Sequence, residues 1–369
     1  MSERLIAVYE VAGPAAEAEK TARAIAYEET VEVPLDFPLK ASIRENVVGR
    51  VAAVAPTHEG RWRVEVDFPA ALAGGRLGAF LNLVYGNASL WTDVRLVDVR
   101  FPASFLGSFS GPNFGLRGLR ELLGVQGRPL LATALKPMGS TNEEFAAAAA
   151  AFARGGGDIV KDDQNIVDTS LESFRSRVDA IAKALSRENK SCLYFPHLSA
   201  PQEELEERLK FILDRGLRGV LICPAIVGLD TLRRLAASHR AVFMAHPAYS
   251  GAFYAQRSQG IEHSLYLGTL MRLAGADISV FPNAGGRFSF TRDECLSITA
   301  KARAPFGHLA AMWPAPGGGM GLGDAETMAA DFGTDAIWLV GGRLLMHAGG
   351  PEAGARAFRE KVLACASGA

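Results

Sequence analysis

Residues that can move protons or bind a metal ion recur in this sequence directly after short apolar runs. They are Lys136, Lys161, Asp163, His197 and His246. A lysine or histidine with a suitable pKa can act as a general base, and carboxylate oxygens are the ligands that Mg²⁺ prefers. If the apolar runs are strands of one barrel, these side chains lie together at the carboxyl ends of the strands, where barrel enzymes have their active sites.

The run Lys161-Asp162-Asp163 has two open interpretations. Side chains alternate along a strand, so Lys161 and Asp163 face one way and Asp162 faces the other. A lysine beside an aspartate can form a plain ion pair. It can also belong to a magnesium site, for which a single carboxylate is a poor start. The second interpretation requires that carbon dioxide carbamylates Lys161, which converts a cation into a second anionic oxygen ligand.

Two glycine-rich loops follow the last two apolar runs, at Gly317-Gly318-Gly319 and at Gly341-Gly342. Backbone N–H groups that glycines leave accessible can cradle an anion, and barrels commonly bind a phosphate in these two loops. The simpler interpretation is that the glycines only turn the chain. Because both loops are rich in glycine, we expect them to hold a phosphate through Gly318, Gly319, Gly341 and Gly342.

Residues 125–369 alternate short apolar runs with helical stretches, separated by Gly, Pro and Asp, and these elements would position the site residues. Eight apolar runs are expected as strands, at residues 128–135, 158–161, 192–195, 219–223, 241–245, 278–281, 309–313 and 336–340. A helical stretch follows each run, at residues 142–154, 171–186, 202–215, 229–238, 262–273, 292–302, 325–332 and 352–363. Eight strand–helix repeats predict a (β/α)8 TIM barrel, with parallel strands that are buried on both faces.

Residues 1–120 have a different pattern. Alternating strands and a helix at residues 15–27 predict a separate α+β domain of the ferredoxin-like type. The chain is therefore expected to have a small N-terminal domain and a barrel domain over residues 125–369.

The composition is that of a soluble globular enzyme with a sizeable core. The 369 residues are 49% hydrophobic and 21% charged, and 39 Lys and Arg balance 40 Asp and Glu. This balance leaves no excess of positive charge that would attract nucleic acid or an anionic membrane, so neither is an expected partner. The four cysteines form no CxxC pair, and the N-terminus has no apolar signal core, so a cytoplasmic location is expected.

Four stretches of the sequence resemble the RuBisCO superfamily in order and spacing. They are Phe109-Ser-Gly-Pro-Asn-Phe-Gly115, Gly127-Arg-Pro-Leu-Leu131, Thr133-Ala-Leu-Lys-Pro137 and Gly157-Asp-Ile-Val-Lys-Asp-Asp163. The Lys-Asp-Asp run after a glycine-rich helix end is the most specific of these. The resemblance extends nearly end to end, and it implies the same two-domain α/β fold.

The resemblance also implies residue roles. Lys136 would be the lysine that enolises the substrate, Lys161 the carbamylated lysine, and Asp163 a ligand of Mg²⁺. His246 matches the histidine after the fifth barrel strand. The remaining site residues would contact substrate, and they are Glu28, Asn87, Thr133, Arg287, Gly318, Gly319, Gly341 and Gly342. Asn87 and Glu28 resemble residues that reach into a neighbouring subunit's site, which implies a homodimer.

Departures from the family pattern argue against carboxylation. Gln164 stands where the carboxylases have a metal-binding glutamate, and Met138 replaces a second lysine. Arg287 takes the place of the lysine that contacts carbon dioxide, and Gly317 replaces a serine in a second phosphate pocket. A neutral amide oxygen of Gln164 adds no charge, so Mg²⁺ should bind more weakly. The chain resembles the RuBisCO-like branch, which keeps enolisation.

These observations favour a Mg²⁺-assisted isomerase that moves a proton on a phosphorylated ketose such as 5-methylthioribulose 1-phosphate. His197, which ends the third run, is a candidate proton shuttle or substrate contact. Three alternatives stay open: an enolase of a diketo-methylthiopentyl phosphate, a decarboxylase in which Arg287 holds a carboxylate, and a catalytically silent protein that binds a phosphorylated ligand.

Overall fold

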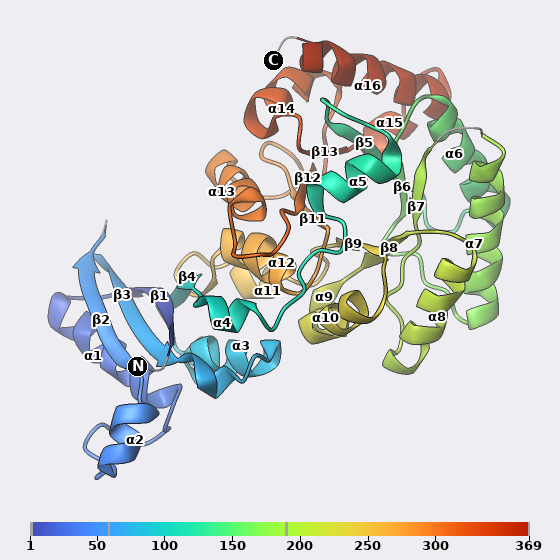
Figure 1. Ribbon diagram of the computed structural model, residues 1–369. Helices are drawn as coiled ribbons and strands as arrows, with labels where there is room; N and C mark the ends of the chain where they lie inside the picture. Colours follow the sequence, from blue (N-terminus) through green and yellow to red (C-terminus); the bar gives the residue numbers. More distant parts are fainter. Residues whose placement is uncertain (1–2, 58–59, 189–190, 368–369) are drawn as a thin grey trace. The chain divides into compact units, whose positions relative to one another are not determined.

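The computed structural model describes residues 3–57, 60–188 and 191–367 (Figure 1). The chain divides into two compact units. The first, called the small unit below, contains the residues up to Ser110 together with Ser250–Tyr266 and Gly307–Leu309. The second, called the barrel unit, contains Gly111–Tyr249, Leu267–Phe306 and the residues from Ala310 onward.

The small unit is built on a five-stranded sheet in the order β10-β4-β1-β3-β2. Its strands are β1 (Arg4–Ala12), β2 (Arg50–Pro56), β3 (Arg61–Pro69), β4 (Val94–Arg100) and β10 (Gly260–Ile261). Its α-helices are α1 (Ala15–Glu28), α2 (Ala41–Asn46), α3 (Leu77–Tyr85), α4 (Ala103–Leu106) and α11 (Gly251–Tyr254). Short 3₁₀ turns, η1 (Ala70–Ala73) and η2 (Asn87–Leu90), flank α3. The α+β expectation for this part of the fold is confirmed.

The barrel unit contains an eight-stranded parallel sheet in the order β7-β6-β5-β13-β12-β11-β9-β8. The strands are β5 (Leu130–Leu135), β6 (Ile159–Asp162), β7 (Leu193–Phe195), β8 (Gly219–Ile222), β9 (Val242–Ala245), β11 (Ile278–Pro282), β12 (Trp313–Gly317) and β13 (Ile337–Leu339). A parallel bridge between His197 and Leu221 joins the two outer strands and closes the barrel. The predicted TIM barrel is confirmed.

Helices surround the barrel in the predicted alternation (Figure 1). They are α6 (Asn142–Arg154), α7 (Leu171–Ser186), α8 (Gln202–Asp214), α9 (Pro224–Val227), α10 (Leu229–Ser238), α12 (Met271–Leu273), α13 (Arg292–Arg303), α14 (Ala325–Phe332), α15 (Gly342–Leu345) and α16 (Gly350–Ser367). The 3₁₀ turn η4 (Leu322–Asp324) precedes α14. In the capping box of α6 the Thr141 hydroxyl accepts the Glu144 N–H and the Glu144 carboxylate accepts the Thr141 N–H, so the helix begins at Asn142, as predicted.

Alternate residues of the barrel strands form one apolar core. Leu130 and Ala132 of β5 share this core with residues of the other strands and with Leu119 and Leu123 of α5 (Gly115–Leu123). The Nε1–H of Trp313 donates to the Gly115 carbonyl at 3.2 Å, which ties α5 to the start of β12. Because α5 packs where the strands begin, the opposite, carboxyl end of the barrel is left for function.

The expected seventh strand at residues 309–313 is wrong, because β12 runs from Trp313 to Gly317. The prolines at 314 and 316 argue against a strand in the sequence, because proline cannot donate a hydrogen bond to a neighbouring strand. They occupy alternate positions, so the missing N–H groups lie on one edge of β12. On that edge only Gly317 pairs, with Leu339 of β13, whereas all five residues of β12 pair with β11.

The expected helix at residues 262–273 is preceded by a strand that belongs to the small unit. Gly260 and Ile261 of β10 pair in parallel with Arg95 and Leu96 of β4. The guanidinium of Arg95 also donates to the Gln256 carbonyl at 2.9 Å and pairs with Glu262 at 3.1 Å. After His263 the chain forms a π-helix, Ser264–Leu270, and then α12.

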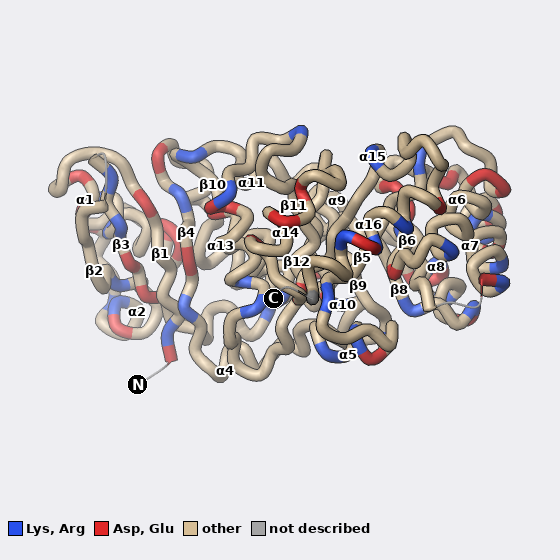
Figure 2. The backbone as a smooth tube through the Cα atoms, turned by 90° about the horizontal axis from the view of Figure 1, so that it is seen from above, with Lys and Arg blue, Asp and Glu red and all other residues tan. Residues whose placement is uncertain are grey.

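Within the described residues, no helix combines the length and the apolar character needed to cross a membrane. Figure 2 shows Lys and Arg interspersed with Asp and Glu along α6, α7 and α8, as the balanced charge of the sequence leads us to expect.

Candidate active site

The ends of β5 and β6 bring two predicted site residues into direct contact. The Nζ of Lys136, directly after β5, forms an ion pair with Oδ2 of Asp163, directly after β6. The side chain of Lys136 is 34% exposed, whereas that of Asp163 is 4% exposed. Burial raises the pKa of Asp163, but the bonds from Lys136 and the Asn165 N–H, with the charge of Lys161, outweigh it and hold this pKa below its ordinary value. Asp163 is therefore an anion in this arrangement.

Lys161 lies buried on the same side of β6 as Asp163. Its Nζ donates to the Asp162 carbonyl at 2.8 Å. Burial lowers its pKa to about 8; the positive charge of Lys136 adds to this effect, and Asp163 opposes it. A substantial fraction of the amine is therefore neutral near physiological pH, as reaction with carbon dioxide requires.

Asp162 faces the other way, as the alternation along the strand predicts. Its carboxylate forms an ion pair with Arg177 of α7 and accepts hydrogen bonds from the Tyr194 hydroxyl and the His197 N–H, both at 2.7 Å. Arg177 also bonds Asp168 at 2.6 Å and is itself buried. This network ties the end of β6 to α7 and β7, on the side of the strand opposite to Lys161 and Asp163.

His197 is buried and neutral, and its tautomer is defined by its partners. Its Nδ1 lies 3.3 Å from the Ile166 carbonyl, which can only accept, so Nδ1 carries the ring proton. Its Nε2 lies 3.6 Å from the Cys223 Sγ and accepts from that thiol. Burial lowers the pKa of His197 and raises that of Cys223. Sequence reasoning missed Cys223, although it follows the fourth barrel strand as the other site residues follow theirs.

His246, after β9, is a half-buried neutral imidazole. Its Nδ1 accepts the Ala248 N–H at 3.2 Å, which leaves the ring proton on Nε2. Burial lowers the pKa of His246 well below its usual value, and the charges of Lys161 and Lys136 lower it further. The charges of both lysines therefore act on the His246 imidazole.

The cluster at the ends of β5 and β6 offers few oxygen donors for Mg²⁺. Within the described ranges, no three His, Cys, Asp or Glu side chains gather as a metal site. Asp163 supplies one anionic oxygen, and Gln164, half-buried in the turn after β6, supplies at most a neutral one. The residues fit Mg²⁺ once Lys161 carries a carbamate, because its buried amine lies beside Asp163.

The two glycine loops have geometries that suit an anion cradle. Gly318 and Gly319 adopt φ values of +98° and +122°, which side chains rarely tolerate. A Cβ at Gly341 or Gly342 would meet open space. Over the described part of the chain, the N–H groups of these four glycines donate no recorded hydrogen bond. The loop with Arg287 lies against Gly318, whose carbonyl accepts the Arg287 N–H at 3.0 Å.

Thr133 is not brought into this group. Its side chain is buried and its hydroxyl donates to the Val340 carbonyl at 2.7 Å, which links β5 to the residue after β13. Side chains alternate along β5, and those of Leu130 and Ala132 face the barrel core, so the side chain of Thr133 faces the other way. Its contact is therefore between strands and not with Lys136.

Glu28 and Asn87 lie in the small unit and are hydrogen bonded to each other. The Nδ2 of Asn87 donates to Oε1 of Glu28 at 2.9 Å, although the residues are 59 apart in sequence. Their pairing means that whatever Asn87 contacts, Glu28 lies beside it.

Most of the large apolar side chains that the barrel unit exposes follow the barrel strands and so belong to the mouth. This apolar rim consists of Met138, Val167, Ile226, Tyr249, Phe288 and Met346. The ring of Phe288 lies against Gly318, where a Cβ would approach it to 3.3 Å. Apolar groups exposed around a mouth favour a ligand with an apolar part.

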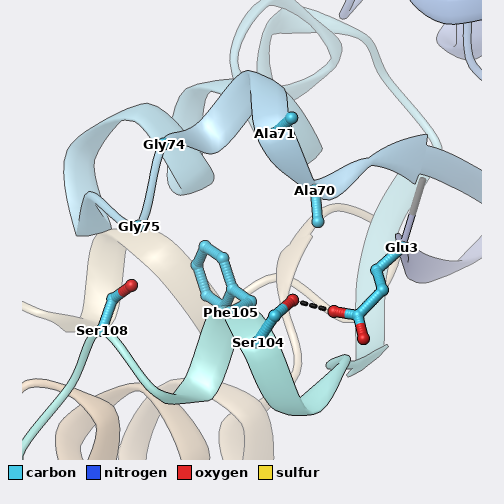
Figure 3. A pocket seen from close by; sticks show the side chains of 8 residues that line it. All are labelled: Glu3, Ala70, Ala71, Gly74, Gly75, Ser104, Phe105 and Ser108. Carbon is cyan, nitrogen blue, oxygen red and sulfur yellow. Dashed lines mark hydrogen bonds between the residues drawn. The ribbon is translucent and has the colours of Figure 1, made fainter.

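A cavity of about 350 Å³ in the small unit contains none of the predicted site residues (Figure 3). Its polar lining is Glu3, Ser104 and Ser108, and the Ser104 hydroxyl donates to the Glu3 carboxylate. Phe105 and small residues form the rest of the wall.

Comparison with known proteins gives concordant results. Residues 115–286 match the family ribulose bisphosphate carboxylase large chain, catalytic domain. A protein of Rhodospirillum rubrum named 5-methylthioribulose-1-phosphate isomerase is 37% identical, over 94% of this chain and 92% of that one. A protein of Bacillus licheniformis named 2,3-diketo-5-methylthiopentyl-1-phosphate enolase is 33% identical, over 98% and 92%.

A solved structure supports the same relationship. The crystal structure of a Rubisco-like protein from Rhodopseudomonas palustris is 36% identical to this chain, covers 98% of both chains and superposes with a TM-score of 0.88. The similarity covers both the small unit and the barrel unit. The chain therefore belongs to the RuBisCO superfamily, in its branch of RuBisCO-like proteins.

Proposed function

We propose that this protein is a Mg²⁺-dependent isomerase that moves a proton on the carbon chain of 5-methylthioribulose 1-phosphate or a closely related ketose phosphate. The observation that carries the proposal is the cluster of Lys136, Lys161 and Asp163 at adjacent strand ends. Such a cluster combines a base with anionic oxygen ligands. The relative from Rhodospirillum rubrum, whose name states this activity, supports the choice of substrate.

Lys161 and Asp163 would hold the metal, with Gln164 as a neutral third donor. The neutral Nζ of Lys161 forms a bond to the carbon of carbon dioxide and loses a proton, which gives an anionic carbamate. Bound Mg²⁺ would polarise the substrate carbonyl and so acidify the adjacent C–H bond. The low pKa of Lys161 supports this assignment, since only the neutral amine reacts.

Lys136 would remove the proton. Its Nζ is partly exposed and pairs with the oxygen of Asp163, so a second cation at that oxygen would displace it toward the substrate. His246 carries a proton on Nε2 and His197 has its only ring proton turned to the Ile166 carbonyl. His246 is therefore the better candidate to return a proton, and His197 holds the adjacent strand end.

Gly318, Gly319, Gly341 and Gly342 would bind the phosphate through their backbone N–H groups, which have no protein acceptor in the described residues. Arg287, whose backbone N–H bonds the Gly318 carbonyl, would bind a second anionic group or the phosphate itself. The apolar rim suits the methylthio end of the substrate, because that end has no charged group.

The active unit would be a homodimer in which Asn87 and Glu28 of one subunit complete the barrel mouth of the other. Their mutual hydrogen bond presents an amide and a carboxylate together, which suits a substrate hydroxyl. The protein would act in the cytoplasm.

A second candidate is the enolase reaction on a diketo-methylthiopentyl phosphate, which the name of the Bacillus licheniformis relative favours. Both reactions begin when a base removes a proton beside a carbonyl, so the same cluster would serve either one. They differ in where the proton returns.

Proton exchange in heavy water tests the proposal. The protein is incubated with Mg²⁺, bicarbonate and each candidate phosphate in turn, and C–H deuteration and product are followed by NMR. We expect deuterium to enter 5-methylthioribulose 1-phosphate and its isomer. Deuteration of the diketo compound alone would support the enolase, and exchange with neither compound would contradict both reactions.

A further inference from the structure

A buried carboxylate in the small unit holds the turn that carries Asn87. Oε2 of Glu29 accepts the Gly86 N–H at 3.0 Å, and Oε1 accepts the Ala88 N–H at 2.5 Å. Glu29 is 8% exposed. Both of its oxygens are thus committed to backbone groups on either side of Asn87.

The turn is shaped around this carboxylate. A Cβ on Gly86 would lie 2.9 Å from the Glu29 Oε2 and 2.5 Å from the Asn82 carbonyl oxygen, so only glycine allows the approach. Asn87, between the two bonded amides, donates its own side-chain N–H to Glu28 at 2.9 Å. Neighbouring glutamates therefore bind the backbone of the turn and its side chain, respectively.

The charges around Glu29 are unfavourable for a carboxylate. Tyr9 of β1, Tyr85 of α3, and Glu28 and Glu32 at the end of α1 and just beyond it interact with it electrostatically. Among the described residues, no lysine or arginine forms an ion pair with it. Burial, with smaller contributions from the charges of Glu28 and Glu32, raises the pKa of Glu29 to about 7, against the two backbone hydrogen bonds. A buried acid in these surroundings contributes little net stability, so its two backbone bonds point to a positioning role.

We propose that Glu29 is a positioning residue for the reaction: its carboxylate fixes the Gly86–Ala88 turn and thereby aims Asn87 and Glu28 at the substrate. The role of Asn87 and Glu28 in catalysis rests on the proposed function, whereas the hold of Glu29 on the turn does not.

Ionisation of Glu29 should set one limb of the pH profile. The carboxylate accepts both N–H groups strongly, and protonation weakens at least one of these bonds, because charge-assisted hydrogen bonds are the stronger ones. The turn is therefore held best above about pH 7, where Glu29 is ionised. Turnover should rise with pH through this range.

Glu29→Gln tests the inference with an isosteric side chain that has one acceptor oxygen and one N–H₂ donor. The donor meets a backbone N–H, so the turn loses one bond. We expect kcat/KM to fall on the order of tenfold to hundredfold through misplacement of Asn87, and the limb near pH 7 to disappear. Glu32→Gln is the matched control: it removes the same charge three residues later, from an exposed side chain that bonds neither amide of the turn. It should leave the rate above the limb unchanged and move the limb only slightly, to lower pH, because Glu32 raises the pKa of Glu29.

A direct readout does not require activity. In ¹⁵N-labelled protein, the Gly86 and Ala88 amide signals should titrate with a midpoint near pH 7 in wild type and at slightly lower pH in Glu32→Gln, but should not titrate in Glu29→Gln. Amide signals that do not titrate in wild type would overturn the inference, whichever substrate the enzyme uses.

A double-variant cycle separates positioning from general loss of structure. If Glu29 acts through Asn87, then Glu29→Gln should cause little further loss in an Asn87→Ala background. Additive losses, or a Glu29→Gln variant with wild-type rate and pH profile, would contradict the inference and leave the proposed function standing. Absence of proton exchange in wild type would instead reject the proposed function, while the amide titration still decides whether Glu29 holds the turn.

Discussion

Lys136 and Asp163 form an ion pair across the ends of β5 and β6, so the proposed base and the proposed metal ligand share one oxygen. Oδ2 of Asp163 has no hydrogen-bond partner in the described residues other than this pairing. A divalent cation at Asp163 would therefore compete with the ammonium group of Lys136. This competition links metal binding to the release of the base.

Lys136→Met should abolish catalysis without unfolding the protein. Loss of a general base typically costs about 10²- to 10⁴-fold in rate. The melting temperature should stay nearly unchanged, because Lys136 is one-third exposed and Asp163 keeps the neighbouring charge of Lys161. Proton exchange and thermal unfolding measure the two effects. Exchange at the wild-type rate would move the base to His246 or His197.

Gln164→Glu should lower the Mg²⁺ concentration needed for half-maximal activity, because it adds a third anionic donor beside Asp163 and the Lys161 carbamate. Asn165→Asp makes the same chemical change one residue later, at an exposed position, and serves as the control. Magnesium titrations of activity compare the three proteins. Equal requirements in Gln164→Glu and wild type would remove Gln164 from the metal site.

Lys161 should take up carbon dioxide in a pH-dependent way. Its pKa of about 8 means that the neutral, reactive amine increases roughly fivefold between pH 7 and pH 8. With ¹³C-labelled bicarbonate and Mg²⁺, we expect a carbamate carbon signal that increases by about the same factor between pH 7 and pH 8. The signal should vanish in Lys161→Arg and persist in Lys210→Arg, a change at an exposed lysine of α8. A signal retained in Lys161→Arg would contradict the assignment.

A shared active site predicts complementation between inactive variants. Asn87→Ala damages one half of each site and Lys136→Met the other half. Random mixing in a homodimer produces hybrid dimers with one intact site, so activity should return to about a quarter of wild type. Co-expressed or denatured and refolded mixtures provide the measurement. If mixing restores nothing although each variant is dimeric, Asn87 serves its own subunit.

Arg177→Ala should destabilise the protein by about 3–5 kcal/mol, because it leaves the buried carboxylates of Asp162 and Asp168 without their cation. Arg175→Ala, two residues earlier on α7, is the control. Its partner Glu207 is 57% exposed, so the loss should be below about 1 kcal/mol. Urea unfolding measures both. Similar losses in the two variants would mean that the Asp162 network does not hold the end of β6.

Local patterns were sufficient for most of the barrel. Helices α6, α7 and α10 begin and end at the predicted residues, because helical periodicity, caps and glycine punctuation act over a few neighbouring residues. The opposite facing of Asp162 and Asp163 was predictable for the same reason, since alternation along a strand is a local property. The proposed roles of the site residues came instead from the resemblance to a family, because hydrophobic periodicity predicts secondary structure and not chemistry.

Tertiary structure decided the features that depend on distant partners. It placed β12 over residues of proline-rich sequence, because pairing with β11 outweighs the missing N–H groups. It joined residues 260–261 to the sheet of the small unit, through β4. It also turned Thr133 toward Val340 and set Cys223 beside His197.

The contrast is clearest in the small unit. The sequence by itself predicted a helix over residues 15–27, directly before Glu28 and Glu29, but it did not predict α3, the helix that precedes Asn87. Only the fold decided that Glu29 binds the backbone on either side of Asn87 while Glu28 binds its side chain. Helix ends are specified by residues within a turn of each other, whereas contacts across 57 to 59 residues depend on how the whole unit packs.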